Sequence, residues 1–232
     1  MRKVSAIILV FVMIFAVGCT AGESVPGEDL ILHARKEYAA LDSAHVEVVN
    51  NETGEAEQVF IFKYDEKGMM TYSYVGMAEG IYLAQYNNGR EQFTNDNGEI
   101  IALDASSLQF AAYSREVPYP MAGEGLILFY KKAVIAEGSY VEEHDGITEV
   151  HHRYDVSKIG EYDGEGELAG FDVTYRFGAD GSLIDLTETT VERFEVDEQN
   201  SSVIIHSYTI YISERNEVAR VENVVDISGV RD

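Results

Sequence analysis

The chain has 232 residues, enough for a single domain with a sizeable hydrophobic core. Its 41 acidic and 17 basic side chains give a net charge of −24. This charge argues against nucleic acid as a partner, because binding to phosphates depends on lysine and arginine, and it disfavours docking on anionic lipid. The single cysteine excludes an internal disulfide, so the core must stabilise the domain.

The N-terminal segment has the pattern of a secretory signal. Arg2 and Lys3 precede the apolar run 4–17, which is shorter than the roughly 20 residues of a membrane-spanning helix and has the length of a signal-peptide core. The run ends in Ala-Val-Gly-Cys at 16–19, which resembles the lipobox of bacterial lipoproteins, although leucine is commonest where Ala16 stands. A cleaved signal with a chance cysteine is the alternative.

The lipobox resemblance implies cleavage before Cys19 and a lipid on its thiol. Two or more acyl chains anchor a protein stably, so we predict a protein held at the extracytoplasmic face of the cell membrane. Loss of residues 1–18 as a signal peptide leaves 15 basic against 41 acidic side chains, a net charge of −26. We expect residues 19–28 to form a lipidated tether and residues 29–232 to form one domain.

An amphipathic helix is predicted over residues 29–44, where five apolar positions share one helical face: Leu30, Ile31, Ala34, Tyr38 and Leu41. After it the apolar period changes to two, and Asn-Gly and Asp-Gly turn signals become dense. This pattern predicts an antiparallel meander of about eleven strands. We expect them at 45–50, 57–64, 69–76, 79–86, 90–94, 99–103, 138–143, 146–155, 169–178, 182–196 and 201–213.

The meander is interrupted between residues 105 and 137, where strand alternation is lost. We expect a helix over 106–116, a break at Pro118 and Pro120, and a second helix over 123–137. The two prolines, with the glycines that follow them, would let this insertion hinge.

The early strands are apolar on both faces, whereas the later ones have one apolar and one polar face. In 59–64 and 81–86 both sets of alternate positions are largely apolar, but in 171–177 Asp172, Thr174 and Arg176 oppose the apolar set. A strand that is apolar on both faces needs cover on both sides or a cavity on one. We therefore predict an α+β fold: a strongly curved antiparallel half-barrel, with the N-terminal helix and an inserted helical lid on its concave face.

This order of elements resembles the LolA/LolB-like lipoprotein-carrier fold, including the lipid-binding lipoproteins of Gram-positive bacteria. The resemblance covers about 30–230 and rests on the N-terminal helix with its Ala-rich end (YAALDSA, 38–44), the long meander, the insertion and the returning strands. It implies a hydrophobic cavity for acyl chains under the lid and no catalytic residues. Cys19 departs from the soluble carrier of Gram-negative cells and agrees better with the lipid-anchored members.

A hydrophobic cavity is the first candidate site. Aromatic residues tolerate a surface that is apolar yet sometimes wet, and a pocket for one or two acyl chains has a volume of roughly 300–1,000 Å³. The alternative is a filled core. The predicted lining comprises Phe60, Phe62, Tyr72, Tyr74 and Tyr82 from the sheet, with Phe110, Leu126 and Phe129 from the lid.

Other patterns predict neither an enzyme nor a cofactor or metal site. The acidic loop 161–167 lacks the spacing of a calcium loop. His151 and His152 are adjacent in a strand and should point to opposite faces, while His206 should lie on an apolar face. The Gly-Glu-Gly-Glu run at 164–167 precedes a strand and is too acidic for a dinucleotide, and motifs of hydrolases are absent from the sequence.

Taken together, the sequence predicts a membrane-anchored, extracytoplasmic lipoprotein that binds a hydrophobic ligand, an acyl chain or lipid, between sheet and lid. The alternative is a non-enzymatic protein-interaction or sensor module of the cell envelope with a filled core, whose interface would be an edge strand or the lid exterior.

Overall fold

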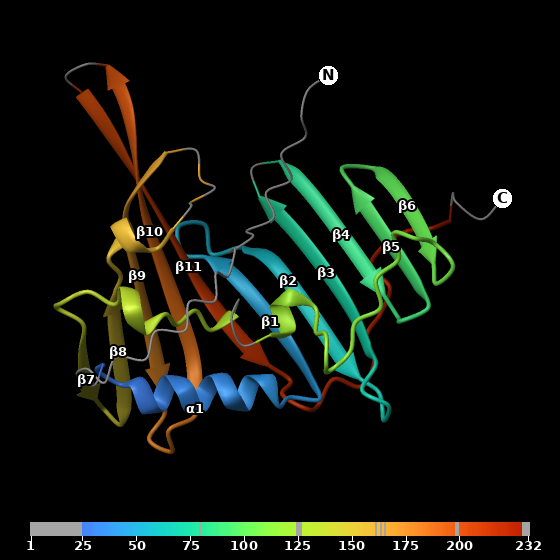
Figure 1. Cartoon of the computed structure of the whole chain (residues 1–232), viewed down its shortest axis with the longest axis horizontal. Helices are drawn as coiled ribbons and strands as arrows, with labels where there is room; N and C mark the ends of the chain where they lie inside the picture. Colours follow the sequence, from blue (N-terminus) through green and yellow to red (C-terminus); the bar gives the residue numbers. More distant parts are fainter. Residues whose placement is uncertain are drawn as a thin grey trace.

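The computed structural model describes residues 25–228 other than 79, 124–126, 161, 163, 165, 198 and 199. Within them the chain forms one open antiparallel sheet of eleven strands, with the helix α1 (Glu28–Ala39) lying across one face (Figure 1). The predicted signal peptide and Cys19 lie outside the described residues. In the described part of the chain, none of the helices has the length and apolar character that a membrane span requires.

All eleven predicted strands are present, each within a few residues of its expected position. Alternating apolar residues and positive-φ turn residues between them were sufficient signals. The strands are β1 (Ser43–Asn50), β2 (Ala56–Tyr64), β3 (Met70–Ala78), β4 (Ile81–Asn87), β5 (Glu91–Asp96), β6 (Glu99–Asp104), β7 (Tyr140–His144), β8 (Ile147–Arg153), β9 (Glu167–Phe177), β10 (Leu183–Asp197) and β11 (Asn200–Ser213).

The sheet consists of two meanders joined by one long-range pairing. Its order is β6-β5-β4-β3-β2-β1-β11-β10-β9-β8-β7, so every neighbouring pair is consecutive in sequence except β1 and β11. Val46 pairs with Ile212 and Val48 with Ile210 across that junction. The outer strands β6 and β7 are not joined to each other, so the barrel is open, as the half-barrel prediction requires.

Helix α1 is shorter than the predicted 29–44 because the chain turns into β1 at Ser43. It starts after Gly27, whose φ of 66° is in the left-handed region. A Cβ at Gly27 would lie 2.4 Å from Cγ2 of Val150, so glycine also permits close contact with β8. The helix buries Ile31, Ala34 and Tyr38 against the sheet.

The prediction of a helical lid is not confirmed. Residues 105–139, hereafter the strap, contain turns and extended chain over the whole of the expected helix 106–116. From residue 128 onward the expected helix 123–137 is replaced by irregular chain and a 3-10 turn, η2 (Lys132–Val134), and another such turn, η1 (Pro120–Ala122), follows the prolines. The strap connects the two opposite edges of the sheet, and extended chain covers about 3.3 Å per residue against 1.5 Å in a helix.

The core has two parts, one on each face of the sheet. The larger part fills the concave face between the sheet, α1 and the strap. The smaller part lies on the opposite face of β3–β6, where Ala84 and Phe93 pack beneath Val225 of the C-terminal segment. Both faces of the early strands are therefore covered, which accounts for their apolar residues. A further 3-10 turn, η3 (Val156–Lys158), follows β8.

Candidate functional site

Three of the predicted cavity residues form the floor of the concave face. Phe62 pairs with Tyr72 across β2 and β3, and Phe60 follows on the same face. All three side chains are buried. The rings of Phe60 and Phe62 stack with centroids 5.5 Å apart, and Phe60 lies 5.9 Å from Tyr72.

The strap covers this floor with aromatic rings of its own. Tyr119 stacks on Tyr72 at 4.3 Å and on Phe60 at 5.3 Å between ring centroids. Tyr113 meets Tyr72 edge-on at 5.7 Å and Tyr119 at 5.2 Å. The hydroxyl of Tyr119 is hydrogen-bonded to Oε1 of Gln85 at 3.2 Å. Tyrosine rings of the chain itself thus occupy the position that the sequence assigned to a ligand.

The remaining predicted lining residues are distributed over several places. Tyr74 is half-buried and packs against the main core. Tyr82 pairs with Met77 and lies on the opposite face, in the smaller core, so its assignment to the concave face is wrong. Phe110 is half-buried in the strap, and Phe129 packs at 5.1 Å on Tyr154, over β8 and β9. Leu126 lies outside the described residues.

Side chains of α1 and β9 hold the strap in place through hydrogen bonds to its backbone carbonyls. Arg35 of α1 donates to the carbonyl oxygens of Leu128 at 3.0 Å and Tyr130 at 3.2 Å. The hydroxyl of Tyr38 donates to the carbonyl of Met121, and that of Tyr175 in β9 donates to the carbonyl of Phe129. The described residues of the strap therefore have a defined position without forming the predicted helices.

A narrow crevice lies between α1 and the end of the sheet. It encloses about 220 Å³, and its floor is mostly apolar. Arg215 is part of its lining, and the guanidinium donates to the carbonyls of Leu183 at 2.6 Å and Ile212 at 3.2 Å. The lining residues are Ala34, Glu37, Tyr38, Leu41, Leu128, Ser182, Leu183, Ile212, Arg215 and Asn216. Sequence reasoning missed this site because its walls come from four separate segments.

The concave face of β8–β10 also buries titratable groups. His152 is buried, its Nε2 lies 2.8 Å from the carbonyl oxygen of Pro26, and burial lowers the pKa of its imidazole. Burial raises the pKa of Glu188 to about 7, and its Oε1 has no hydrogen-bond partner among the described residues. The Glu188 charge also raises the pKa of Tyr154 and Tyr175, although burial is the larger cause.

The other histidine predictions have mixed outcomes. His151 and His152 do point to opposite faces: the Nδ1 of His151 lies 3.0 Å from the hydroxyl of Thr174, on the face away from the core. His206 was expected on an apolar face, but it is half-exposed and its Nε2 lies 4.0 Å from Oε2 of Glu192. The acidic loop 161–167 is described only in part.

The hairpin of β10 and β11 extends beyond its neighbours as a projecting arm (Figure 1). The pairing of β1 with β11 ends at Asn50 and Tyr208, so the outer part of β11 has β10 as its only described neighbour. Val203, Ile204 and Ile205 in this part are 54%, 45% and 61% exposed. Large aliphatic side chains on both faces of an unprotected strand edge are unusual for a soluble surface.

Comparisons with known proteins give distant likenesses only. Neither a scan against protein-family models nor a search of curated proteins returned a match. Among solved structures, LprF from Mycobacterium bovis is similar with a TM-score of 0.46 and 11% identity, over 88% of this chain and all of that one. A structure of MucB in complex with MucA(peri) has a TM-score of 0.18 and 8% identity, over 79% of this chain and 92% of that one.

Proposed function

We propose that the protein is a lipid-anchored binding module of the cell envelope that takes a hydrophobic ligand with an acyl chain, and that the ligand enters at the crevice beneath α1. The crevice is the observation that carries the proposal, because its lining combines apolar side chains with the guanidinium of Arg215, although the carboxylate of Glu37 is also part of the lining. Apolar area removed from water contributes about 25 cal/mol per Å². No chemical step is required.

The lining of the crevice offers contacts for both parts of an anionic lipid or fatty acid, the acyl chain and the charged head group. Leu183, Ile212 and Leu128 would contact the chain, and Arg215 would pair with a carboxylate or phosphate. Two guanidinium nitrogens of Arg215 are already bound to backbone carbonyls, so the charge is held in place in the lining. Pre-positioned donors lower the entropy that binding costs.

The size of the crevice implies that the strap moves when a long chain binds. Its volume of about 220 Å³ is smaller than the roughly 300–1,000 Å³ of most ligand pockets. Leu128 of the strap forms one wall, and Arg35 and Tyr38 hold the strap through backbone carbonyls. Displacing the strap would extend the crevice towards the aromatic floor at Phe60.

Occupancy of the crevice can be tested with a filling variant. Protein purified from membranes is analysed by native mass spectrometry for acyl species and titrated with a fluorescent fatty acid. Ala34→Leu, in the crevice wall, should weaken binding at least about tenfold, whereas Ala39→Leu, at an exposed position of the same helix, should leave binding unchanged. Empty protein that binds no fatty acid, or equal binding by both variants, would exclude this ligand site.

Membrane attachment needs a separate test, because it rests on the lipobox at Cys19. Cys19→Ser should move the protein from the membrane fraction to the soluble extracytoplasmic fraction, and the wild type should incorporate radiolabelled fatty acid. If the variant fractionates like the wild type, the lipid anchor is refuted while the crevice proposal is unaffected.

A second function, recruitment of another protein, is favoured by the projecting hairpin. The backbone N–H of Asn51 donates to the carbonyl of Ser207, so the alternate residues Ser201, Val203 and Ile205 present their backbone groups to the same open edge. Unpaired backbone groups are too costly in hydrocarbon for this edge to enter a membrane. An extended segment of a partner, neutral or basic in view of the charge of −24, could add as a further strand.

The hairpin proposal predicts a specific loss of co-purification. Ile205→Asp should abolish capture of the partner from envelope extracts, and a peptide identified from that partner should protect the amides of Val203 and Ile205 from hydrogen exchange. Ile184→Asp is the control, because Ile184 is an exposed aliphatic residue of the neighbouring strand β10. Equal capture by both variants would refute strand addition at this edge.

A further inference from the structure

We propose that the β7–β8 hairpin carries a zinc site formed by Glu142, Glu149 and His151, with His144 as a fourth ligand. The sequence reads Glu-x-His in each strand, at 142–144 and at 149–151, on either side of the Asp145-Gly146 turn. Residues two apart in a strand share a face, so the four side chains project from the same side of the hairpin. This side is away from the core and from the crevice, so the proposal is independent of acyl-chain binding.

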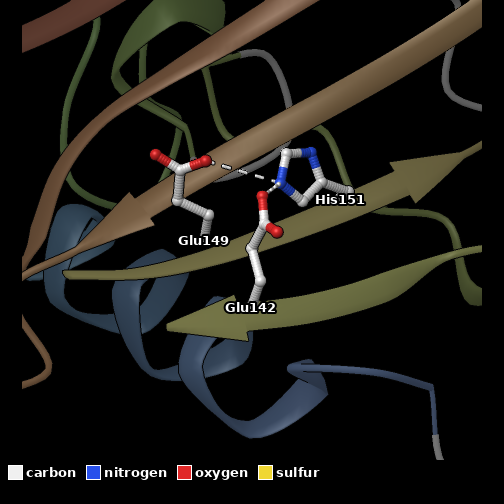
Figure 2. A group of neighbouring side chains, drawn as sticks. All are labelled: Glu142, Glu149 and His151. Atoms are coloured by element: carbon white, nitrogen blue, oxygen red, sulfur yellow. Dashed lines mark hydrogen bonds and ion pairs between the residues drawn. The ribbon is translucent and has the colours of Figure 1, made fainter. Parts of the chain in front are cut away.

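The donor atoms converge in the structure (Figure 2). The Nε2 of His151 lies 3.2 Å from Oε1 of Glu142 and 3.5 Å from Oε2 of Glu149. The three donor atoms lie within 4.8 Å of one another. In a tetrahedral site with bonds of about 2.0–2.2 Å, ligand atoms are separated by about 3.3–3.6 Å, so small shifts would accommodate an ion. All three residues are partly exposed, which leaves a path for the ion.

The carboxylates of the hairpin favour a bound cation. Glu142 and Glu149 are directly opposite each other in the register of β7 and β8, and like charges in that position are destabilising. The Nε2 of His151 lies near an oxygen of each carboxylate. Because Nε2 can carry only one proton, it cannot donate a well-aligned hydrogen bond to both oxygens at once. A divalent ion would satisfy both carboxylates and accept the nitrogen lone pair.

The surroundings hold the ligands in the orientation that coordination needs. The Nδ1 of His151 is 3.0 Å from the hydroxyl of Thr174, an interaction that leaves Nε2 free for a metal. The ring stacks on Tyr140 with centroids 4.4 Å apart. Nε of Arg176 lies 3.5 Å from Oε1 of Glu149, which leaves Oε2 facing the imidazole, although the Arg176 charge lowers the affinity for a cation.

A fourth donor is close on the same strand. Nε2 of His144 lies 3.7 Å from Oε2 of Glu142, and its side chain is exposed and free to rotate towards the site. Two nitrogen and two carboxylate oxygen donors in a tetrahedral arrangement favour zinc over calcium or magnesium, which prefer oxygen ligands alone. The ion would join β7, an edge strand with mostly exposed side chains, to its only described neighbour β8.

The site is tested by calorimetric titration of the purified full chain, carrying Cys19→Ser to remove its thiol, with ZnCl2 and separately with CaCl2. We expect one zinc ion per chain, no comparable calcium binding, and a higher melting temperature with zinc. His151→Ala and Glu149→Gln should each weaken zinc binding at least about tenfold, and His144→Ala should weaken it less. Glu149→Gln is nearly isosteric, and its melting temperature without metal shows whether it is folded.

His33→Ala is the matched control, because Nε2 of His33 lies 3.3 Å from a single carboxylate, Glu37, on α1. It should bind zinc like the parent protein. Absence of zinc binding, calcium binding of equal strength, or zinc binding that survives both His151→Ala and Glu149→Gln would overturn the proposal. Loss of fatty-acid binding in the crevice variants would not affect any of these results.

Discussion

Replacing Tyr119 by alanine should both destabilise the protein and expose its aromatic floor. The ring packs on Phe60, Tyr72 and Tyr113, and aromatic pairs contribute about 0.5–1.5 kcal/mol each beyond the area they bury. Truncation of a buried aromatic residue costs about 3–5 kcal/mol. Tyr119 is only partly buried, so we expect a loss near the lower end, about 3 kcal/mol, in urea unfolding.

Two measurements separate the role of the ring from that of the hydroxyl. Tyr119→Phe keeps the stacking and removes only the hydrogen bond to Gln85, so it should cost about 0.5–1.5 kcal/mol. The space left by alanine should increase binding of a hydrophobic fluorescent dye, and phenylalanine should not. If Tyr119→Ala costs no more than Tyr119→Phe and leaves dye binding unchanged, the strap does not fill the concave face in solution.

Three further predictions concern the strap, the carboxyl group of Glu188 and the projecting β10–β11 hairpin. Arg35→Gln should lose charged donors to the carbonyls of Leu128 and Tyr130, costing about 1–3 kcal/mol, and should speed amide exchange in the strap while exchange in β1 and β2 is unchanged. Burial raises the pKa of Glu188 from 4.5 to about 7. Below pH 4.5 its carboxyl group is protonated in both the folded and the unfolded chain. Between pH 4.5 and about 7 the carboxyl group ionises only in the unfolded chain. The free energy of unfolding of the wild type should therefore fall by up to about 3 kcal/mol over that range relative to Glu188→Gln, as measured by urea unfolding at pH 4.5 and 8. If the unfolding free energies of the two proteins change equally with pH, the raised pKa of Glu188 is contradicted. Ile205→Asp, at an exposed position, should change the unfolding free energy by less than about 0.5 kcal/mol while reducing self-association in light scattering.

The strands could be predicted from the sequence because each one is specified locally. Alternating residues such as Phe171, Val173 and Tyr175 define a face, and turn residues in the left-handed region, such as Asn97 and Asp145, define the ends. The pairing of β1 with β11 has no local signal, and neither has the conformation of the strap. Its helical periodicity was overridden by tertiary contacts, because side chains such as Arg35 and Tyr38 bind its backbone carbonyls.

In the candidate sites, too, some features are set by residues close in the sequence and others by tertiary contacts. Phe60, Phe62 and Tyr72 share one face because they lie in two neighbouring strands joined by a short turn, a relation that the local sequence specifies. Tyr82 was misplaced because Ala78 pairs with Ile81, so the even-numbered residues of β3 and the odd-numbered residues of β4 share the concave face. Arg215 joins the crevice through tertiary contacts that the sequence does not reveal. The Glu-x-His pattern, in contrast, is repeated on both sides of Asp145-Gly146 and is visible in the sequence.

The pairing of β1 with β11 has a consequence for biogenesis. His45 and Ser213 are 168 positions apart and meet across the centre of the sheet. The meander β1–β6 can assemble early, as soon as the N-terminal half of the chain is available, but the edge of β1 that pairs with β11 stays open until that last strand is available. Closing a loop of this length costs about 4–5 kcal/mol of chain entropy before any contact is gained. Folding should therefore be completed only once the whole chain is available, and until then the open edge of β1 exposes the incomplete sheet to aggregation.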